Sequence, residues 1–347
     1  MSLQALLGIE LPIIQAPMAG VQLGALTVAV SQAGGLGSLP CAMLGPDALR
    51  AELAAIGAQT RRPYNVNFFA HTSPVFSAAR DAAWRGALAP YYREFGIDAR
   101  DIAAGSPRHP FNAEYADLLA PFRPAVVSFH FGLPSPELVA RVKSWGAKVL
   151  SSATTVDEAR WLADRGVDAI IAQGLEAGGH RGMFLSNDAT TQIGTFALLP
   201  QIVRAVNVPV IAAGGIADRQ GVLAAMALGA AGVQVGTAYL LCDEATTSAV
   251  HRRALQGEAA RHTALTNVFT GRPARGIVNR LMRELGPISA AAPQFPLATA
   301  AIAPLRAKAE SLGSGAFSPL WSGQNASGCK AVAAAALTRE LAGLPQL

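Results

Sequence analysis

One histidine lies inside an otherwise apolar stretch of the sequence, at His130 within 125-AVVSFHFGLP-134. Phe129 and Phe131 flank it, and burial among such side chains favours the neutral imidazole over the charged one. A neutral imidazole can accept a proton from a carbon acid, and general base catalysis of this kind contributes about 10²–10⁴-fold to a rate. His130 is therefore our candidate catalytic residue. The alternative is a core histidine that is hydrogen bonded to a neighbouring carbonyl group.

Pairs of residues that could bind a phosphate occur at three places in the second half of the chain. They are Gly178-Gly179, Gly214-Gly215 and Gly236-Thr237. Backbone N–H groups with little side chain around them can cradle an anion, and the hydroxyl of Thr237 could donate one more hydrogen bond. A single pair is also compatible with a tight turn. Three pairs after successive apolar segments favour a ligand that carries a phosphate.

Four side-chain amides near the ends of apolar segments indicate what kind of ligand this would be. They are Gln15, Asn67, Gln173 and Gln234. An amide both donates and accepts hydrogen bonds, which matches the pyrimidine edge of a flavin ring. Each amide could instead hold a loop in place, because buried polar groups need partners.

The other polar residues near strand ends carry weaker expectations. His71 could line a pocket, whereas His109 and His262 lie in polar surroundings and are expected at the surface. Glu176 and Asp218 are expected to hold the geometry of their loops. There is no His and carboxylate cluster with the spacing of metal ligands, so we predict no metal site.

The elements that must position these residues alternate between two patterns. Eight segments are apolar along their length, as strands buried on both faces are, namely Ile13–Met18, Gly35–Leu39, Tyr64–Phe69, Ala125–Phe131, Lys148–Ala153, Ala169–Gly174, Val208–Gly215 and Gly232–Thr237. Helical patterns lie between them, at Leu23–Ala33, Pro46–Gln59, Pro136–Trp145, Thr155–Arg165, Thr195–Ala205 and Asp218–Leu228. Thr154 and Asp218 are expected to cap two of these helices.

This alternation predicts an α/β protein with a (β/α)8 TIM barrel, in which functional residues lie at the C-terminal ends of the strands. An open, doubly wound sheet is the alternative. It is less favoured because 35-GLGSLP-40 lacks the third glycine of a dinucleotide-binding fingerprint. We assign residues 1–69 and 123–267 to the barrel. Residues 70–122 and 268–347 are assigned to a smaller, mainly helical lobe, with a loop at 311–328 that could lie over a site.

Composition excludes several classes of protein. Apolar residues make up 51% of the chain and charged residues 15%, which is typical of a globular protein with a large core. The net charge of +5 comes without a block of like charges, so no nucleic-acid-binding arm is expected. Three scattered cysteines argue against disulfides, and neither a leader peptide nor a membrane span is recognisable. We expect a cytoplasmic protein, which could form a homodimer.

Taken together, the motifs resemble those of the nitronate monooxygenase family, formerly called 2-nitropropane dioxygenases, in its class I bacterial type. The resemblance spans about residues 10–270 and is carried by 13-IIQAPMAGV-21, 31-SQAGGLGS-38, 65-NVNFF-69, 127-VSFHFG-132, 172-AQGLEAGGHRG-182, 211-IAAGGIAD-218 and 234-QVGTAYL-240. It implies a barrel that binds FMN and oxidises alkyl nitronates with O2 to a carbonyl compound and nitrite. The nitronate of 3-nitropropionate is a favoured substrate class of this family.

The resemblance also implies roles for individual residues. His130 corresponds to the family's histidine, and His180 is expected beside the cofactor or behind the residues that touch it. The FMN contacts would be Ala16, Pro17, Met18, Asn67, Gln173, Gly178, Gly179, Gly214, Gly215, Gln234, Gly236 and Thr237. Relatives often carry tyrosines and a lysine near the substrate, but residues 294–309 contain no tyrosine and only Lys308. This departure bears on the substrate and leaves the cofactor unaffected.

Two other functions remain open on the sequence alone. The same barrel could be an FMN-dependent reductase that takes hydride from NAD(P)H, acting on an enoyl thioester or a quinone. It could also be a non-catalytic protein that binds a flavin or another phosphate-bearing ligand.

Overall fold

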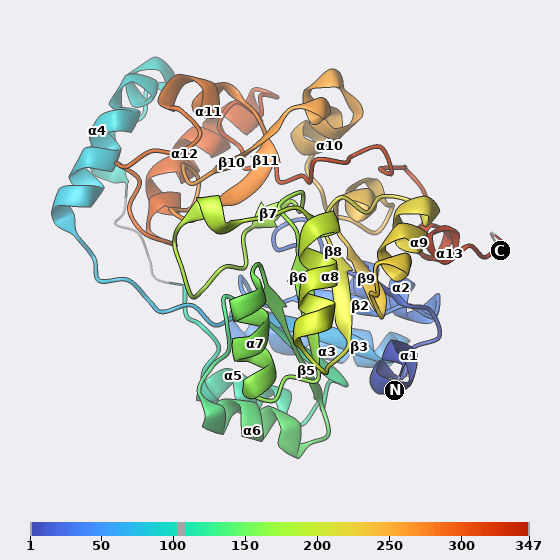
Figure 1. Cartoon of the computed structure of the whole chain (residues 1–347). Helices are drawn as coiled ribbons and strands as arrows, with labels where there is room; N and C mark the ends of the chain where they lie inside the picture. The colour runs from blue at the N-terminus through green and yellow to red at the C-terminus, as the bar shows by residue number, and fades with distance from the viewer. Residues whose placement is uncertain (1, 103–107, 346–347) are drawn as a thin grey trace.

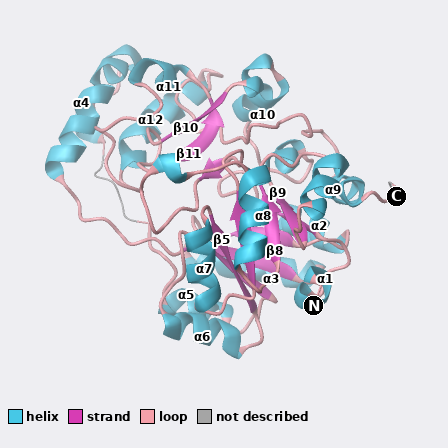
Figure 2. Cartoon of the chain, in the orientation of Figure 1, coloured by secondary structure: helices cyan, strands magenta, loops and turns pink. Residues whose placement is uncertain are grey.

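The structure, a computed structural model, describes residues 2–102 and 108–345, so parts of the predicted lobe at 103–107 and 346–347 lie outside it. Its described residues include a sheet of eight parallel strands: β1 (Ile13–Gln15), β2 (Gly37–Pro40), β3 (Tyr64–Phe69), β4 (Val126–His130), β5 (Lys148–Ala153), β6 (Ala169–Gln173), β8 (Val210–Ala213) and β9 (Gly232–Val235). Helices surround this sheet (Figures 1 and 2). The predicted TIM barrel is confirmed, and the open-sheet alternative is wrong.

The barrel closes between its first two strands. The strands follow the order β1-β9-β8-β6-β5-β4-β3-β2. The N–H group of Leu36 donates to the carbonyl of Ile13 at 2.9 Å, and that of Gln15 donates to the carbonyl of Leu36 at 3.0 Å. Such closure removes the free edge that an open sheet would present.

A short helix fills the N-terminal end of the barrel. This helix, α1 (Leu3–Leu7), buries Leu3 and Leu7 against inward-facing side chains such as Ile14 and Ile211. Gly232 makes room for it, because a Cβ atom there would lie 2.4 Å from Leu3. With this end plugged, a ligand site can form only at the other end, where the strands finish.

The helices around the barrel are α2 (Gly24–Gln32), α3 (Pro46–Gln59), α5 (Ala113–Leu119), α6 (Pro136–Ser144), α7 (Val156–Asp164), α8 (Thr195–Ala205), α9 (Arg219–Ala227) and α13 (Ala334–Ala342). Asp218 caps α9, as predicted, by accepting from the N–H group of Gly221 at 2.8 Å. The prediction that Thr154 is a cap was wrong. Thr155 caps α7, and the Thr154 hydroxyl donates to Glu158.

The remaining elements form the smaller lobe on the C-terminal side of the barrel (Figure 1). Its helices are α4 (Ala78–Phe95), α10 (Ala249–Gln256), α11 (Arg280–Leu285) and α12 (Ala298–Ser311). A three-stranded antiparallel sheet joins β10 (Thr263–Thr266) and β11 (Ala274–Ile277) to β7 (Gly179–His180). Because β7 belongs to the loop after β6, this sheet ties the lobe directly to the barrel.

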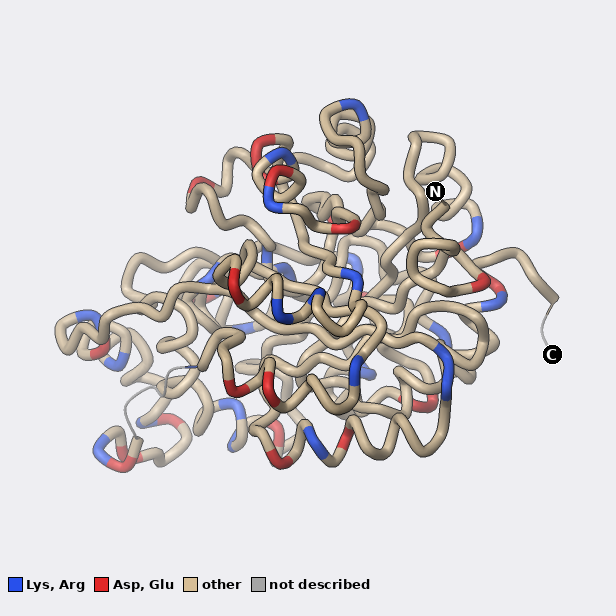
Figure 3. The backbone as a smooth tube through the Cα atoms, turned by 90° about the horizontal axis from the view of Figure 1, so that it is seen from below, with Lys and Arg blue, Asp and Glu red and all other residues tan. Residues whose placement is uncertain are grey.

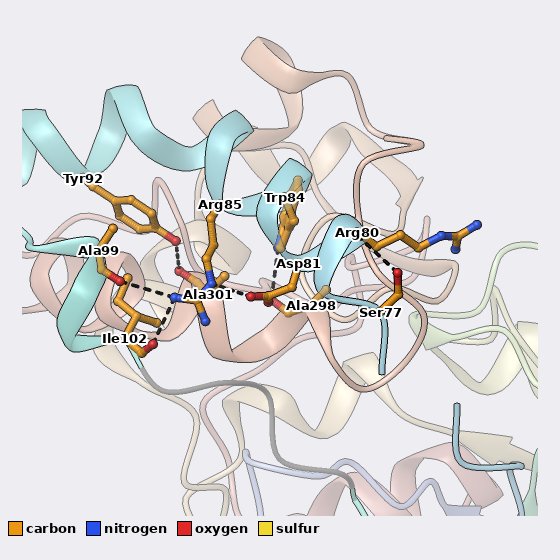
Figure 4. A network of polar contacts seen from close by, with 10 residues as sticks. All are labelled: Ser77, Arg80, Asp81, Trp84, Arg85, Tyr92, Ala99, Ile102, Ala298 and Ala301. Carbon is orange, nitrogen blue, oxygen red and sulfur yellow. Dashed lines mark hydrogen bonds and ion pairs between the residues drawn. The ribbon is translucent and has the colours of Figure 1, made fainter. Parts of the chain in front are cut away.

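The contact between α4 and α12 assembles the lobe from segments that are two hundred residues apart (Figure 4). Trp84 donates from Nε1 to the carbonyl of Ala298 at 3.2 Å, and the Tyr92 hydroxyl donates to the carbonyl of Ala301 at 2.6 Å. The predicted division differs from the packing at several elements: α10 and β10, whose residues were assigned to the barrel, belong to the lobe. Both α5 and α13, whose residues were assigned to the lobe, pack against barrel helices.

Charges of both signs are interspersed along the chain (Figure 3). Most of the ion pairs are exposed, such as those of Arg100 with Asp98 and of Arg261 with Glu258, and pairs of this kind add little stability. Within the described residues, no helix is both long and apolar enough to cross a membrane.

Candidate active site

A cavity of about 410 Å³ lies between the C-terminal ends of the barrel strands and the lobe. The predicted catalytic residue, the predicted FMN contacts and His180 all line it: Ala16, Pro17, Met18, Asn67, His130, Gln173, Gly178, Gly179, His180, Gly214, Gly215, Gln234, Gly236 and Thr237. Residues from α10, α12 and the 311–328 loop complete the wall. The barrel therefore brings the predicted residues together.

One end of the cavity is suited to an anion. Four backbone N–H groups have no protein acceptor within the described part of the chain, those of Gly214, Gly215, Gly236 and Thr237. Gly214 and Gly215 have φ values of 117° and 75°, which other residues rarely adopt. Unused N–H groups at converging strand ends form a cradle of the kind that binds phosphate.

The 311–328 loop lies directly against this cradle. The N–H group of Gly323 donates to Thr237 Oγ1 at 2.9 Å, and Asn325 donates from Nδ2 to the carbonyl of Gly215 at 3.1 Å. A Cβ atom on Gly178 would lie only 2.5 Å from the backbone nitrogen of Gly323. Gly178 is thus required for the approach of this loop, a reason that its sequence motif did not indicate.

The predicted amides differ in how they are used. The Oε1 atom of Gln234 is buried and has no partner within the described residues. Asn67 donates from Nδ2 to the Ser128 hydroxyl at 2.9 Å. Gln173 is fully engaged by the protein, since it donates to the carbonyl of His180 at 2.9 Å and accepts from the N–H group of Gly182 at 2.7 Å. The buried oxygen of Gln234 could therefore be satisfied by a ligand that donates a hydrogen bond.

Gln15 does not reach the cavity. Its side chain accepts from the N–H group of Ser38 at 3.0 Å and pairs with Gln22 at 2.6 Å. Gln15 therefore joins β1 to β2. This is the structural role that we considered as the alternative for each of the four amides.

His130 lines the cavity at the end of β4, with both ring nitrogens hydrogen bonded. Nε2 faces the carbonyl of His180 at 3.1 Å, and Nδ1 faces the Ser152 hydroxyl at 3.0 Å. A carbonyl oxygen can only accept, so the neutral ring carries its proton on Nε2. Nδ1 then holds the basic lone pair and accepts a hydrogen bond from Ser152.

Burial keeps this imidazole neutral. It lowers the pKa of His130 from 6.5 to about 4, with smaller contributions in the same direction from Arg272 and Arg181. The direction predicted from the flanking phenylalanines is confirmed. At neutral pH the ring is therefore able to accept a proton, provided that Ser152 releases Nδ1.

His180 is held on the lobe side of the cavity. Nε2 lies 2.9 Å from the hydroxyl of Thr270, and the ring centroid lies 5.3 Å from that of Phe295 and 5.6 Å from that of Trp321. Burial, reinforced by nearby Arg108, holds the pKa of His180 well below its usual value. Its carbonyl accepts from both Gln173 and His130, so His180 positions the candidate base.

His71 does not line the cavity, although its sequence position suggested that it could. It lies behind Phe295, with ring centroids 5.0 Å apart, and its Nε2 atom donates to the carbonyl of Arg108 at 3.0 Å. His109 and His262 are exposed, as predicted. Glu176 holds its loop, as predicted, by accepting from the backbone and hydroxyl of Thr195, each at 2.8 Å.

Buried arginines are the main feature that sequence reasoning missed. Arg181 is fully buried and donates to the carbonyls of Gly174 and Gln173, each at 2.7 Å, which fixes the end of β6. The guanidinium of Arg272 stacks on Phe131, with its carbon 3.9 Å from the ring centroid. Arg181 follows His180 directly in the GGHRG motif, so that motif could have indicated it. Arg272 had no such signal.

No group of His, Cys, Asp and Glu side chains within the described ranges is arranged to hold a metal ion. The cavity instead offers a phosphate cradle, one unpaired amide oxygen and a neutral histidine. The donors and the acceptor fit the phosphate and the polar ring edge of a flavin mononucleotide.

The fold and the cavity define a barrel enzyme with its site at the carboxyl ends of the strands. The family model of nitronate monooxygenase matches residues 1–342. The chain therefore belongs to the nitronate monooxygenase family, which is a family of oxidoreductases.

Individual relatives cover almost the whole chain. The nitronate monooxygenase of Paraburkholderia phytofirmans is 42% identical, over 98% of this chain and 93% of that protein. The crystal structure of nitroalkane oxidase from Streptomyces ansochromogenes is similar with a TM-score of 0.88 and 37% identity, over 99% of this chain and 97% of that one. FabK from Thermotoga maritima is more distant, with a TM-score of 0.70 and 27% identity over 98% and 94%.

Proposed function

We propose that this protein uses FMN and O2 to oxidise alkyl nitronates of the propionate 3-nitronate type, giving a carbonyl compound and nitrite. The observation that carries the proposal is the single cavity that combines an unused N–H cradle with a neutral histidine. Membership of the nitronate monooxygenase family supports the same activity. A cytoplasmic location and a homodimer remain predictions.

The residues that would hold FMN divide into two groups. The N–H groups of Gly214, Gly215, Gly236 and Thr237 would bind the phosphate. Gln234 would accept a hydrogen bond from the ring edge through its unpaired Oε1 atom. Asn67 and the Ala16, Pro17 and Met18 segment would line the ring. When bound, the flavin supplies the electron acceptor that no side chain of the protein can replace.

His130 would act differently on the two forms of a nitro compound. A neutral nitroalkane must lose a proton from carbon, and Nδ1 of His130 would receive it once the Ser152 hydroxyl turns away. A nitronate has already lost that proton. Toward it, His130 would have only an orienting role, through the same hydrogen-bonding position.

This difference can be measured with the purified protein. We expect yellow protein that consumes O2 with propionate 3-nitronate. Changing His130→Asn should reduce turnover of nitroethane by about 10²–10⁴-fold and that of ethyl nitronate by less than about tenfold. The exposed His262→Asn is the matched control and should change neither. Equal activity of His130→Asn on both substrates would remove His130 from the mechanism.

The nicotinamide-linked reductase is tested with the same preparation. Under anaerobic conditions, NADH should not bleach the flavin absorbance on the timescale of turnover. Rapid bleaching would instead favour the reductase, and colourless protein that takes up no FMN would contradict both enzyme functions.

A further inference from the structure

Arg108 contributes a guanidinium group to the wall of the cavity, on the lobe side. Its Cζ atom lies 5.7 Å from the ring centroid of Phe295. Phe295 in turn lies 5.3 Å from His180 and 5.6 Å from Phe131, whose ring centroid is 4.6 Å from that of His130. Arg108 and His130 line the same cavity, and the rings of Phe295 and Phe131 lie beside them.

Arg108, which is half-buried, differs from Arg181, Arg272 and Arg275 in having no acceptor among the described residues. Its side chain forms no hydrogen bond or ion pair with any residue that the structure describes. By contrast, Arg181 and Arg275 donate to backbone carbonyls, and Arg272 donates to the carbonyl of Met183. Burial lowers the pKa of Arg108, and no carboxylate opposes that effect. A partly desolvated cation without a partner is costly, and an anionic ligand would remove that cost.

The other charged groups of the cavity are already paired. Among the described lining residues, the remaining cation is Arg306, and it donates to Glu310 at 2.8 Å. The cavity lining also includes apolar side chains such as Phe69, Phe269 and Ile302. A short aliphatic chain that ends in one carboxylate matches a surface of this kind.

The backbone of Arg108 is held by one buried histidine. His71, only 5% exposed, donates to its carbonyl from the barrel side at 3.0 Å. This contact fixes the backbone of Arg108 itself, which is what a binding residue needs.

We propose that Arg108 binds the carboxylate of propionate 3-nitronate and is the residue by which this chain selects a nitronate that carries a carboxylate over one that does not. This inference rests on the proposed function. A guanidinium can bind a carboxylate with two parallel hydrogen bonds, which also fixes the direction in which the substrate enters. Arg108 thus supplies a specificity determinant in a chain whose residues 294–309 lack tyrosine.

The test compares two substrates that share their reacting end. Propionate 3-nitronate carries the carboxylate, and butyl-1-nitronate carries an ethyl group in its place. Changing Arg108→Met should lower kcat/KM for propionate 3-nitronate by roughly 10- to 100-fold, and for butyl-1-nitronate by less than about threefold. Arg93→Met removes an equal charge from an exposed position of α4 and should alter neither value. An equal loss for both substrates in Arg108→Met would overturn the proposal.

A binding measurement separates this proposal from the proposed function. Succinate has two planar anionic ends but cannot be oxidised as a nitronate. Its Kd, measured by calorimetry on the protein as purified, should rise at least about tenfold in Arg108→Met and stay unchanged in Arg93→Met. If the protein oxidises no nitronate, the proposed function fails while this result still tests the anion site. Equal succinate affinity in wild type and Arg108→Met would refute the site directly.

Discussion

At the residue scale, the candidate base is defined by partners that come from other strands. The apolar neighbours of His130 were enough to predict a lowered pKa, because an apolar segment is expected to be buried and burial disfavours the charged imidazole. Ser152 and the carbonyl of His180 lie 22 and 50 residues away, so only the fold could assign the tautomer. The isolation of Arg108 could not be predicted either, since it depends on which groups fail to reach it.

Ser152 should tune the basicity of His130. Its hydroxyl donates to Nδ1 and so stabilises the neutral ring, which lowers the pKa. Changing Ser152→Ala should therefore raise the pKa of His130 by about 0.5–1 unit, the equivalent of one neutral hydrogen bond. In kcat/KM for nitroethane, the loss of activity on acidification should begin near pH 4 in the wild type and at higher pH in the variant. An unmoved acid limb would show that Ser152 does not interact with the base.

At the element scale, the chain leaves the barrel after β9, builds most of the lobe and then returns. Helix α13 packs between α9 and α2, and its Thr338 hydroxyl lies 2.9 Å from that of Tyr239. The sequence predicted a mainly helical segment over residues 268–347, which agrees with this helix. It could not predict the barrel location, because the preceding loop passes over the cradle and carries the helix away from its neighbours in sequence.

The return of α13 should contribute strongly to stability. Leu337 is 1% exposed and packs in the main core, so Leu337→Ala should reduce the free energy of unfolding by about 2–5 kcal/mol. Leu344, just beyond the helix, is 40% exposed, and Leu344→Ala should cost less than about 1 kcal/mol. Urea unfolding followed by circular dichroism measures both. Similar values for the two variants would mean that α13 does not belong to the cooperative core.

At the scale of the whole molecule, buried histidines link stability to pH. His71 and His251 are 5% and 4% exposed, and burial lowers the pKa of each from 6.5 to about 4. Between these two values the unfolded chain binds more protons than the folded one. Stability is therefore fully present above about pH 6.5 and declines as the pH falls towards 4.

Replacing one of these histidines should make the free energy of unfolding fall less steeply as the pH is lowered. For His251→Gln, the loss of stability between pH 7 and pH 5 should be smaller than in the wild type by about 1–2 kcal/mol. Comparing the two proteins at each pH cancels any change in cofactor binding that they share. Identical pH profiles from urea unfolding would show that His251 titrates normally in the folded protein.

The sequence predicted the barrel more accurately than it predicted the division of the chain into barrel and lobe. Each barrel strand is a local apolar segment, so counting segments sufficed for the fold. The cradle could also be anticipated, since glycine pairs at strand ends meet at one end of any such barrel. The lobe depends on contacts such as Trp84 with Ala298, which no local pattern encodes.

The stretch from Gly323 to Asn325 is pinned to the anion cradle and also leads into the last helix. If a phosphate group binds there, we expect its release to be coupled to a loosening of the connection that places α13 in the helical shell. The rate of cofactor release and the local stability of the C-terminal segment would then depend on the same local opening equilibrium.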